Sequence, residues 1–151
     1  MTDETKPRRR DYLYFLRIPT RWMDNDVYGH VNNVQYYSFF DTVVNGYLIA
    51  QGVFNPATSA VIGLVVETHC SFFSSLTFPD AIDAGLRVAR IGESSVRYEI
   101  GLFAADAAAA AAQGHFVHVY VDRNTRRPVA LPPPLRQVLM ALMRSAQPAT
   151  H

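Results

Sequence analysis

The stretch NVQYYSFFDTVVNGYLIAQ, residues 33–51, decides the fold, because its apolar residues recur at helical spacing on two nearly opposite faces. One face carries Val34, Tyr37, Val44 and Leu48, and the other carries Tyr36, Phe40, Val43 and Tyr47. Asn32 or Asn33 can cap the start of such a helix, and Gly52 stands where a C-terminal glycine belongs. A surface helix is apolar on one face only, so the pattern predicts a long helix that is buried on all sides.

The rest of the chain supplies strands to wrap around this helix. We expect strands over residues 12–18, 61–73, 86–91, 96–103 and 116–122. The alanine-rich segment 104–114 favours a helix by propensity, but it is short and joins two alternating strands, so we predict a hairpin, with a short helix as the alternative. Prolines 132–134 end the sheet and start a terminal helix. The order predicts an α+β fold with an antiparallel five-stranded sheet around a long central helix, plus a C-terminal helix.

Length and composition bound the class of protein. The 151 residues are 49% hydrophobic and 18% charged, which indicates one domain with a real core rather than a disordered chain. The net charge of +1 gives no field that would favour nucleic acid as a partner. Neither a signal peptide nor an apolar run of the roughly 18 residues that a membrane span needs is present, and the single cysteine excludes an internal disulfide. We therefore expect a cytoplasmic protein without a membrane partner.

The same sequence suggests where the domain begins and ends. Residues 1–10 are polar and rich in arginine, and we expect them to form a disordered tail. We expect the single domain over residues 11–146 and a short C-terminal tail over 147–151.

The segment RWMDNDVYGHVNN, residues 21–33, places carboxylates directly before the predicted helix. Unpaired N–H groups at a helix start carry partial positive charge and can stabilise an oxyanion that develops on a carbonyl. A carboxylate a few residues upstream, such as Asp26, can act on the same carbonyl as a nucleophile or general base. This combination is typical of acyl transfer. The alternative is that Asp24, Asn25 and Asp26 only form a turn and that Asn32 is only a cap.

A longer pattern extends this segment. The run R-W-x-D-x-D-x-x-G-H-V-N-N-x-x-Y-Y-x-x-F-F-D, from Arg21 to Asp41, resembles the signature of the 4-hydroxybenzoyl-CoA thioesterase-like branch of the hotdog-fold superfamily. The resemblance continues in V-V-E-T-H-C-S-F-F (65–73) and R-I-G-E-S-S-V-R-Y (90–98), and it covers about residues 12 to 140. It implies a hotdog fold, in which a sheet wraps a long helix. It also implies hydrolysis of an acyl-CoA thioester to a carboxylic acid and CoA.

The resemblance further implies how the protein works with its partners. Coenzyme A would be part of the substrate, and an acyl carrier protein could take its place. No cofactor and no metal would be needed. The active sites would form between the subunits of a homodimer, which could pair again into a tetramer.

Carried onto this sequence, the resemblance assigns roles to residues of the loop and helix. Asp26 matches the catalytic carboxylate, and Asn33 matches the position whose backbone N–H polarises the thioester carbonyl. His30 either orients Asp26 or a water molecule, or makes a structural hydrogen bond. The expected catalytic residues are Asp26, Asn33 and His30, and the expected substrate-binding residues are Tyr28, Gly29, Val31, Asn32, Tyr36, Tyr37, Asp41 and Arg90.

Other polar residues have two interpretations each. Asp41 falls on an apolar stripe of the helix and is either structural or pocket-shaping, or catalytic. Arg90 belongs to a set of arginines that either bind CoA phosphates or lie at solvated strand ends. We interpret His69, His115 and His118 as hydrogen-bonded structural residues rather than metal ligands, and Cys70 as a packing residue.

Two other functions are compatible with a hotdog fold. A hotdog enoyl-CoA hydratase uses the pattern Asp-x-x-x-x-His, whereas three residues separate Asp26 from His30. The other alternative is a non-catalytic acyl-CoA-binding module, for which Asp26 would be unneeded.

Overall fold

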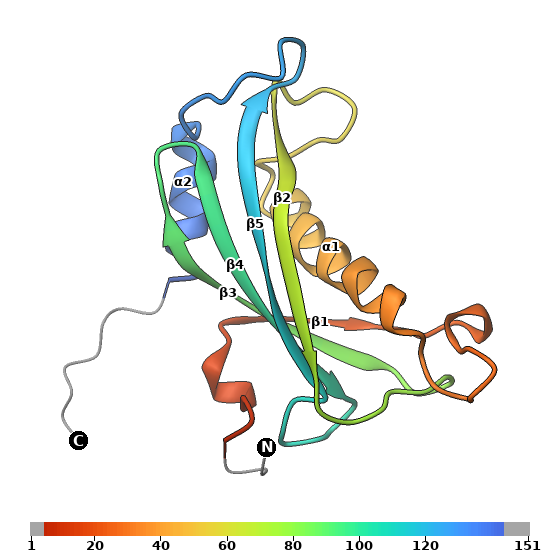
Figure 1. The fold of residues 1–151 in the computed structure, drawn as a ribbon. Helices are drawn as coiled ribbons and strands as arrows, with labels where there is room; N and C mark the ends of the chain where they lie inside the picture. The colour runs from red at the N-terminus through yellow and green to blue at the C-terminus, as the bar shows by residue number, and fades with distance from the viewer. Residues whose placement is uncertain (1–4, 144–151) are drawn as a thin grey trace, which may run out of the picture.

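A computed structural model describes residues 5–143. Its elements, in chain order, are the 3₁₀ turn η1 (Arg9–Asp11), β1 (Tyr14–Ile18), the 3₁₀ turn η2 (Trp22–Asp24), α1 (Asn33–Ala50), β2 (Val61–Phe72), β3 (Ile82–Ile91), β4 (Ser95–Ala104), β5 (Ala112–Asp122) and α2 (Pro133–Met140). The strands form one antiparallel sheet in the order β1-β3-β4-β5-β2, with α1 along its inner face (Figure 1). This confirms the α+β hotdog fold that the sequence predicted.

Helix α1 packs one face tightly against the inner side of the sheet. Phe40 and Val43 are completely buried. The Phe40 ring meets the Phe116 ring of β5 edge-on, with 5.4 Å between centroids. A Cβ at Gly114, also on β5, would lie 2.6 Å from the Phe40 ring, so only glycine lets the helix approach this closely.

The opposite face of α1 is open, so the prediction of a helix buried on all sides is wrong for the single chain. Val34 is 66% exposed, and Asp41 and Ile49 also lie at the surface. A five-stranded sheet reaches around only part of a helix, and the remaining apolar residues need a further surface to cover them. Within the second apolar stripe, Val44 and Leu48 are buried by this chain itself, and only Val34 is left largely exposed.

The connection between β4 and β5 confirms the predicted hairpin. The alanine-rich residues form no helix, and β5 begins at Ala112, four residues before the predicted strand. The Ala111 N–H donates to the Leu102 carbonyl at 2.7 Å, and the Ala111 carbonyl accepts the Phe73 N–H at 2.8 Å. These hydrogen bonds to neighbouring strands satisfy the backbone in an extended form and outweigh the helical propensity of alanine.

The terminal helix α2 lies beside the end of the sheet opposite the loop that precedes α1 (Figure 1). It begins at Pro133, as the proline run predicted. The Tyr47 hydroxyl of α1 donates a hydrogen bond to the Val138 carbonyl at 2.7 Å, and Leu139 is fully buried. Helix α2 is therefore part of the core that surrounds α1.

The N-terminal segment crosses the outer face of the sheet, which differs from the tail expected over residues 1–10. Tyr12 is buried above Gly85 and Gly101, which face each other on β3 and β4. A Cβ at Gly101 would lie 2.5 Å from the Tyr12 ring, so the ring can pack here only because both positions lack a side chain. The segment is thus ordered at least from Arg8, which bridges to Ala109. Residues 1–4 and the expected C-terminal tail over 147–151 lie outside the described residues.

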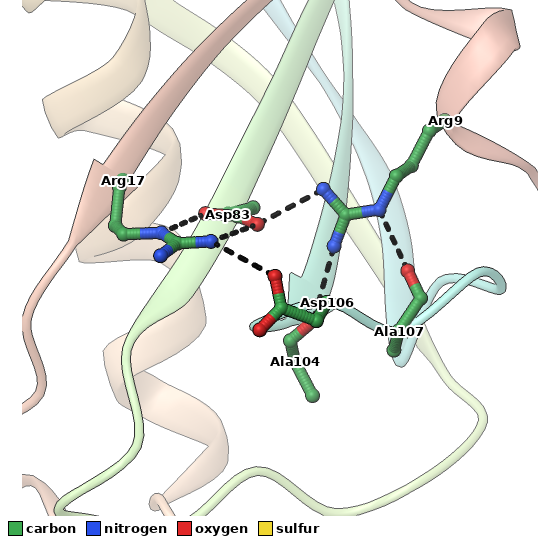
Figure 2. A network of polar contacts seen from close by, with 6 residues as sticks. All are labelled: Arg9, Arg17, Asp83, Ala104, Asp106 and Ala107. Carbon is green, nitrogen blue, oxygen red and sulfur yellow. Dashed lines mark hydrogen bonds and ion pairs between the residues drawn. The ribbon is translucent and has the colours of Figure 1, made fainter.

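Arg9 anchors this segment through a polar network centred on Asp83 (Figure 2). Its guanidinium donates to the Asp83 carboxylate at 2.9 Å and to the Ala107 carbonyl at 2.7 Å. Arg17 of β1 donates to the same carboxylate at 2.7 Å, and it also pairs with exposed Asp106 at 3.5 Å. Hydrogen bonds from Arg17 and Arg9 hold the pKa of Asp83 below its ordinary value. No local pattern pairs residues so far apart, which is why the sequence indicated a tail.

Replacing Asp83 by asparagine (Asp83→Asn) should lower the free energy of unfolding near neutral pH by about 1–3 kcal/mol, because two charged hydrogen-bond donors lose their anion. The folded-state pKa of Asp83 is depressed, so its contribution is complete above its unfolded pKa of about 4 and is lost as the pH falls through the folded value. Urea denaturation across this range should show wild type and variant converging in acid. Asp106→Asn, which removes an exposed partner of the same Arg17, is the control and should change little. A difference between wild type and Asp83→Asn that stays constant with pH would contradict this account.

Candidate functional site

A pocket of about 450 Å³ opens where the loop before α1 meets the end of β2. Its lining combines polar groups from the loop with aromatic rings from α1 and β2. The residues are Asp26, Tyr28, His30, Val31, Asn33, Tyr36, Phe72, Phe73, Ser74 and Ser75. The pocket therefore gathers all three residues expected to be catalytic and three of those expected to bind substrate.

The two aspartates of the loop have different environments. Asp24 is 1% exposed, and Arg21 occupies both of its oxygens, with the backbone N–H at 2.7 Å and the guanidinium at 2.8 Å. Asp26 is half-buried, and its Oδ1 accepts the Tyr28 N–H at 2.9 Å. No donor within residues 5–143 takes its other oxygen. Asp24 therefore holds the loop in shape, whereas Asp26 keeps one oxygen available to a ligand.

The start of α1 leaves one backbone donor unpaired beside the same pocket. Asn32 is the cap, because its side chain accepts the Val34 N–H at 3.0 Å and its carbonyl accepts the Gln35 N–H at 2.9 Å. The N–H of Asn33, the first helical residue, has no acceptor in the described part of the chain. A free N–H at the positive end of an 18-residue helix is suited to a carbonyl oxygen that gains negative charge.

A tight turn carries Asp26 between these groups. The Asp26 N–H donates to the His30 carbonyl at 2.9 Å, and the Gly29 N–H donates to the Asp26 carbonyl at 3.1 Å. Gly29 has a φ of +82°, a conformation that glycine adopts freely. The His30 ring is exposed beside the pocket, and it makes no hydrogen bond to the residues described here. The geometry thus gives no support to the structural alternative for His30.

Aromatic rings form the other wall of the pocket. Tyr36 of α1 is buried and meets Phe72 of β2 edge-on, with 4.9 Å between ring centroids. Burial raises the pKa of the Tyr36 phenol above its ordinary value, so the ring stays neutral. Phe73 continues this wall, and buried Val31 closes its base. The wall is suited to an apolar group attached to the carbonyl that Asp26 would face.

The sequence did not indicate the residues that β2 contributes. Phe72 is the last residue of β2, and Phe73, Ser74 and Ser75 follow it directly, about forty residues after the loop. The one available signal is that they end the longest predicted strand, whose end must lie beside one end of the helix.

Five expected binding residues lie outside the pocket, and three of these come from α1 and β3. Tyr37 packs edge-on against the Phe40 ring, with 5.8 Å between centroids. Asp41 lies on the open face of α1, where partial burial raises its pKa. Arg90 lies near the end of β3, whose start is next to the loop, so roughly 26 Å of strand separates it from that end. Arg90 therefore does not reach the pocket of its own chain.

Gly29 and Asn32 line a second hollow on the other side of the loop. Residues 5–143 contain no group of three or more His, Cys, Asp or Glu side chains arranged to hold a metal ion. No helix in this part of the chain is long and apolar enough to cross a bilayer.

The structure tests the prediction that the strand histidines are hydrogen-bonded structural residues and that Cys70 is a packing residue. His115 bonds to Glu67 at 2.7 Å and His69 to Ser71 at 3.1 Å, as expected of structural residues. His118 is different, because neither ring nitrogen has a partner among the described residues, and burial lowers its pKa to about 4. Cys70 is buried, and burial raises its thiol pKa to about 12, which fits the packing role.

Comparison with known proteins places this geometry in context. Residues 20–139 match the family model of the Thioesterase-like superfamily. The crystal structure of PA5185 from Pseudomonas aeruginosa is 55% identical in sequence, with a TM-score of 0.91, and the match covers 94% of this chain and 99% of that chain. Comparison with curated proteins gave no match.

Two more distant structures share the fold. Slr0204, a 1,4-dihydroxy-2-naphthoyl-CoA thioesterase from Synechocystis, is 16% identical, with a TM-score of 0.78 over 85% of this chain and 96% of that chain. The DHNA-CoA thioesterase from Staphylococcus aureus is 17% identical, with a TM-score of 0.75 over 84% of this chain and 88% of that chain.

Replacing Gly29 by alanine should lower the free energy of unfolding by about 1–2 kcal/mol, because a side chain makes its positive φ unfavourable. A Cβ there would meet no atom within 4 Å, so the effect is conformational and not steric. Gly29→Asn should lose less stability, since asparagine adopts this conformation more readily. Urea denaturation of the two variants tests this order, and equal losses would contradict it.

Proposed function

This chain belongs to the thioesterase-like superfamily, and from this premise we propose that it is an acyl-CoA thioesterase of the 4-hydroxybenzoyl-CoA thioesterase-like branch. It hydrolyses an acyl-CoA thioester to a free carboxylic acid and CoA. One observation carries the proposal: Asp26, which keeps one carboxylate oxygen open, and Asn33, whose N–H is free, line the same pocket. The motif from Arg21 to Asp41 supports the choice of branch.

In the proposed reaction, the thioester carbonyl oxygen lies against the first turn of α1. The Asn33 N–H and the helix dipole stabilise the negative charge that develops on this oxygen. Asp26 either attacks the carbonyl carbon, which displaces CoA and leaves a mixed anhydride that water then hydrolyses, or takes a proton from a water molecule that attacks the carbonyl directly. The C–S bond then breaks, CoA leaves as a thiolate and gains a proton, and water supplies the oxygen of the new carboxylic acid. His30 lies at the pocket edge, where it can orient the water molecule.

The remaining lining suits the rest of such a substrate. Tyr36, Phe72 and Phe73 offer an apolar wall for the acyl group. Tyr28, which is 81% exposed, stands at the open mouth, through which the pantetheine arm of CoA or of an acyl carrier protein would enter.

Asp26→Asn should reduce turnover of acyl-CoA substrates by about 10²–10⁴-fold, because the amide neither attacks nor accepts a proton. The amide oxygen can still accept the Tyr28 N–H, so the turn should persist. The rate is measured with a panel of acyl-CoAs and a thiol reagent that detects the CoA released. Asp106→Asn, an exposed aspartate whose left-handed backbone asparagine tolerates, is the control.

Three outcomes would contradict the proposed function. Unchanged turnover in Asp26→Asn would remove Asp26 from the mechanism. Tight acyl-CoA binding without turnover would indicate a binding module. Hydration of crotonyl-CoA, seen as loss of its ultraviolet absorbance, would indicate a hydratase.

We also propose that the active unit is a homodimer joined along β2. This 12-residue strand forms one edge of the sheet and exposes Val65 and Val66, and a long edge strand is a surface on which another strand can pair. Phe72 lies on this edge and also lines the pocket, so a second copy would help to enclose the substrate. The same copy could cover Val34 on the open face of α1.

Val66→Lys should shift the protein from dimer to monomer, because a lysine on an edge strand opposes pairing. Light scattering after gel filtration should give twice the 16.9 kDa chain mass for wild type and the single mass for the variant. Leu13→Lys places a lysine at a similarly exposed residue near the other edge and should leave the dimer intact. A monomeric wild type would exclude this assembly.

A further inference from the structure

The turn that carries Asp26 is fastened to a distant segment, residues 76–78, by side chains outside the pocket lining. The Thr77 hydroxyl donates to the Gly29 carbonyl at 2.9 Å, a shorter contact than its alternative at 3.2 Å to the Phe78 carbonyl. The Asn25 amide NH₂ donates to the Thr77 hydroxyl at 3.4 Å. The Asn25 amide oxygen accepts the Phe78 N–H at 3.1 Å. We call this set of contacts the Asn25–Thr77 latch.

The latch holds both ends of one compact unit. Residues 26–30 are closed on themselves by hydrogen bonds between Asp26, Gly29 and His30. Asn25 precedes this unit, and Gly29 lies near its end, so the latch clamps it on both sides of Asp26. Beyond the unit, the Val31 N–H donates to the Leu76 carbonyl at 2.8 Å.

The turn has little other support. Val27 is 93% exposed and Tyr28 is 81% exposed, so the tip of the turn packs only slightly against the described residues 5–143. The segment on the other side of the latch is fixed, because Leu76 is buried in the core and the Thr20 hydroxyl donates to the Asp80 carbonyl at 2.7 Å. The latch thus connects a poorly packed turn to a rigid platform.

We propose that Asn25 and Thr77 are positioning residues, which hold the Asp26 carboxylate at its distance from the helix start. This inference rests on the proposed function. Neither side chain lines the pocket: Asn25 borders the hollow on the other side of the loop, and Thr77 lies behind Gly29. The aromatic wall is made by other side chains, Tyr36, Phe72 and Phe73, so we expect the binding of the acyl group to depend little on the latch. A displacement of about 1 Å at a reacting group is enough to slow a reaction by about 100-fold.

The kinetic test compares Thr77→Val with Thr77→Ser. Valine has the shape of threonine without the hydroxyl, and we expect kcat to fall by about 10- to 100-fold while KM changes less than about twofold. Serine keeps the hydroxyl and should restore most of kcat. Thr125→Val, in a surface turn whose hydroxyl accepts the Arg127 N–H, is the matched control and should behave as wild type.

A double variant tests whether the two residues act together. Asn25→Ala should lower kcat as Thr77→Val does, and the combined variant should lose less than the product of the two single effects, because both remove the same connection. Full multiplication of the two effects would show that the residues act separately and would overturn the latch.

A second measurement does not depend on activity. Trp22 is the single tryptophan, and its ring stands edge-on to Phe78 with 5.9 Å between centroids, so it bridges the loop and the platform. We expect its fluorescence anisotropy to decay faster in Thr77→Val and Asn25→Ala than in wild type, Thr77→Ser and Thr125→Val.

The two measurements separate the possible failures. A wild type without thioesterase activity would end the proposed function, and the anisotropy would still decide whether the latch holds the turn. An active wild type with unchanged kcat and anisotropy in Thr77→Val would overturn the latch. A Thr77→Ser variant as impaired as Thr77→Val would show that the hydroxyl is not what matters, and would also overturn it.

Discussion

The close approach of α1 to the sheet is the constraint on which the rest of the structure depends. Phe40 reaches Phe116 only because Gly114 leaves space beneath its ring. This contact fixes the height of the helix above the strands, and one turn earlier it brings Tyr36 against Phe72. The helix start and the end of β2 therefore meet, and the pocket lies at their junction. A bulkier residue at Gly114 would separate the two walls of the site as well as loosen the core.

The two aspartates of the loop have different roles because their carboxylates have different hydrogen-bond partners. Asp24 is saturated by Arg21, and its carbonyl accepts the Asn32 N–H at 2.8 Å, so its role ends at shaping the approach to the helix. Asp26, two residues later, keeps an oxygen free beside the positive end of α1. A helix start favours negative charge nearby, because its unpaired N–H groups carry partial positive charge. The same field would favour the oxyanion of a thioester reaction, so one structural feature supports both groups of the proposed mechanism.

The outer and inner faces of the sheet differ in how far this chain covers them. On the outer face, the Tyr12 ring packs over Gly85 and Gly101, and Arg9 fastens the N-terminal segment to Asp83. On the inner side, Val34 and the edge of β2 stay open. The chain covers part of its own outer face and leaves apolar surface next to the pocket, where a second copy would help to enclose the substrate of the proposed reaction.

Local sequence patterns were enough to predict the kinds of element and the centre of the site. Helical and alternating periodicities are local, so they gave α1, the five strands and the terminal helix, with errors of a few residues at their ends. Asp26 and Asn33 are close in the chain, so their meeting at one pocket followed from the loop motif alone. Contacts between residues far apart in the chain could be found only in the tertiary structure. It places Phe72 in the pocket wall, and it pairs Thr77 with Gly29 and Asp83 with Arg9. It also places Arg90 too far away to reach the pocket of its own chain. These depend on strand order and register, which bring together residues tens of positions apart and leave no trace in a local pattern.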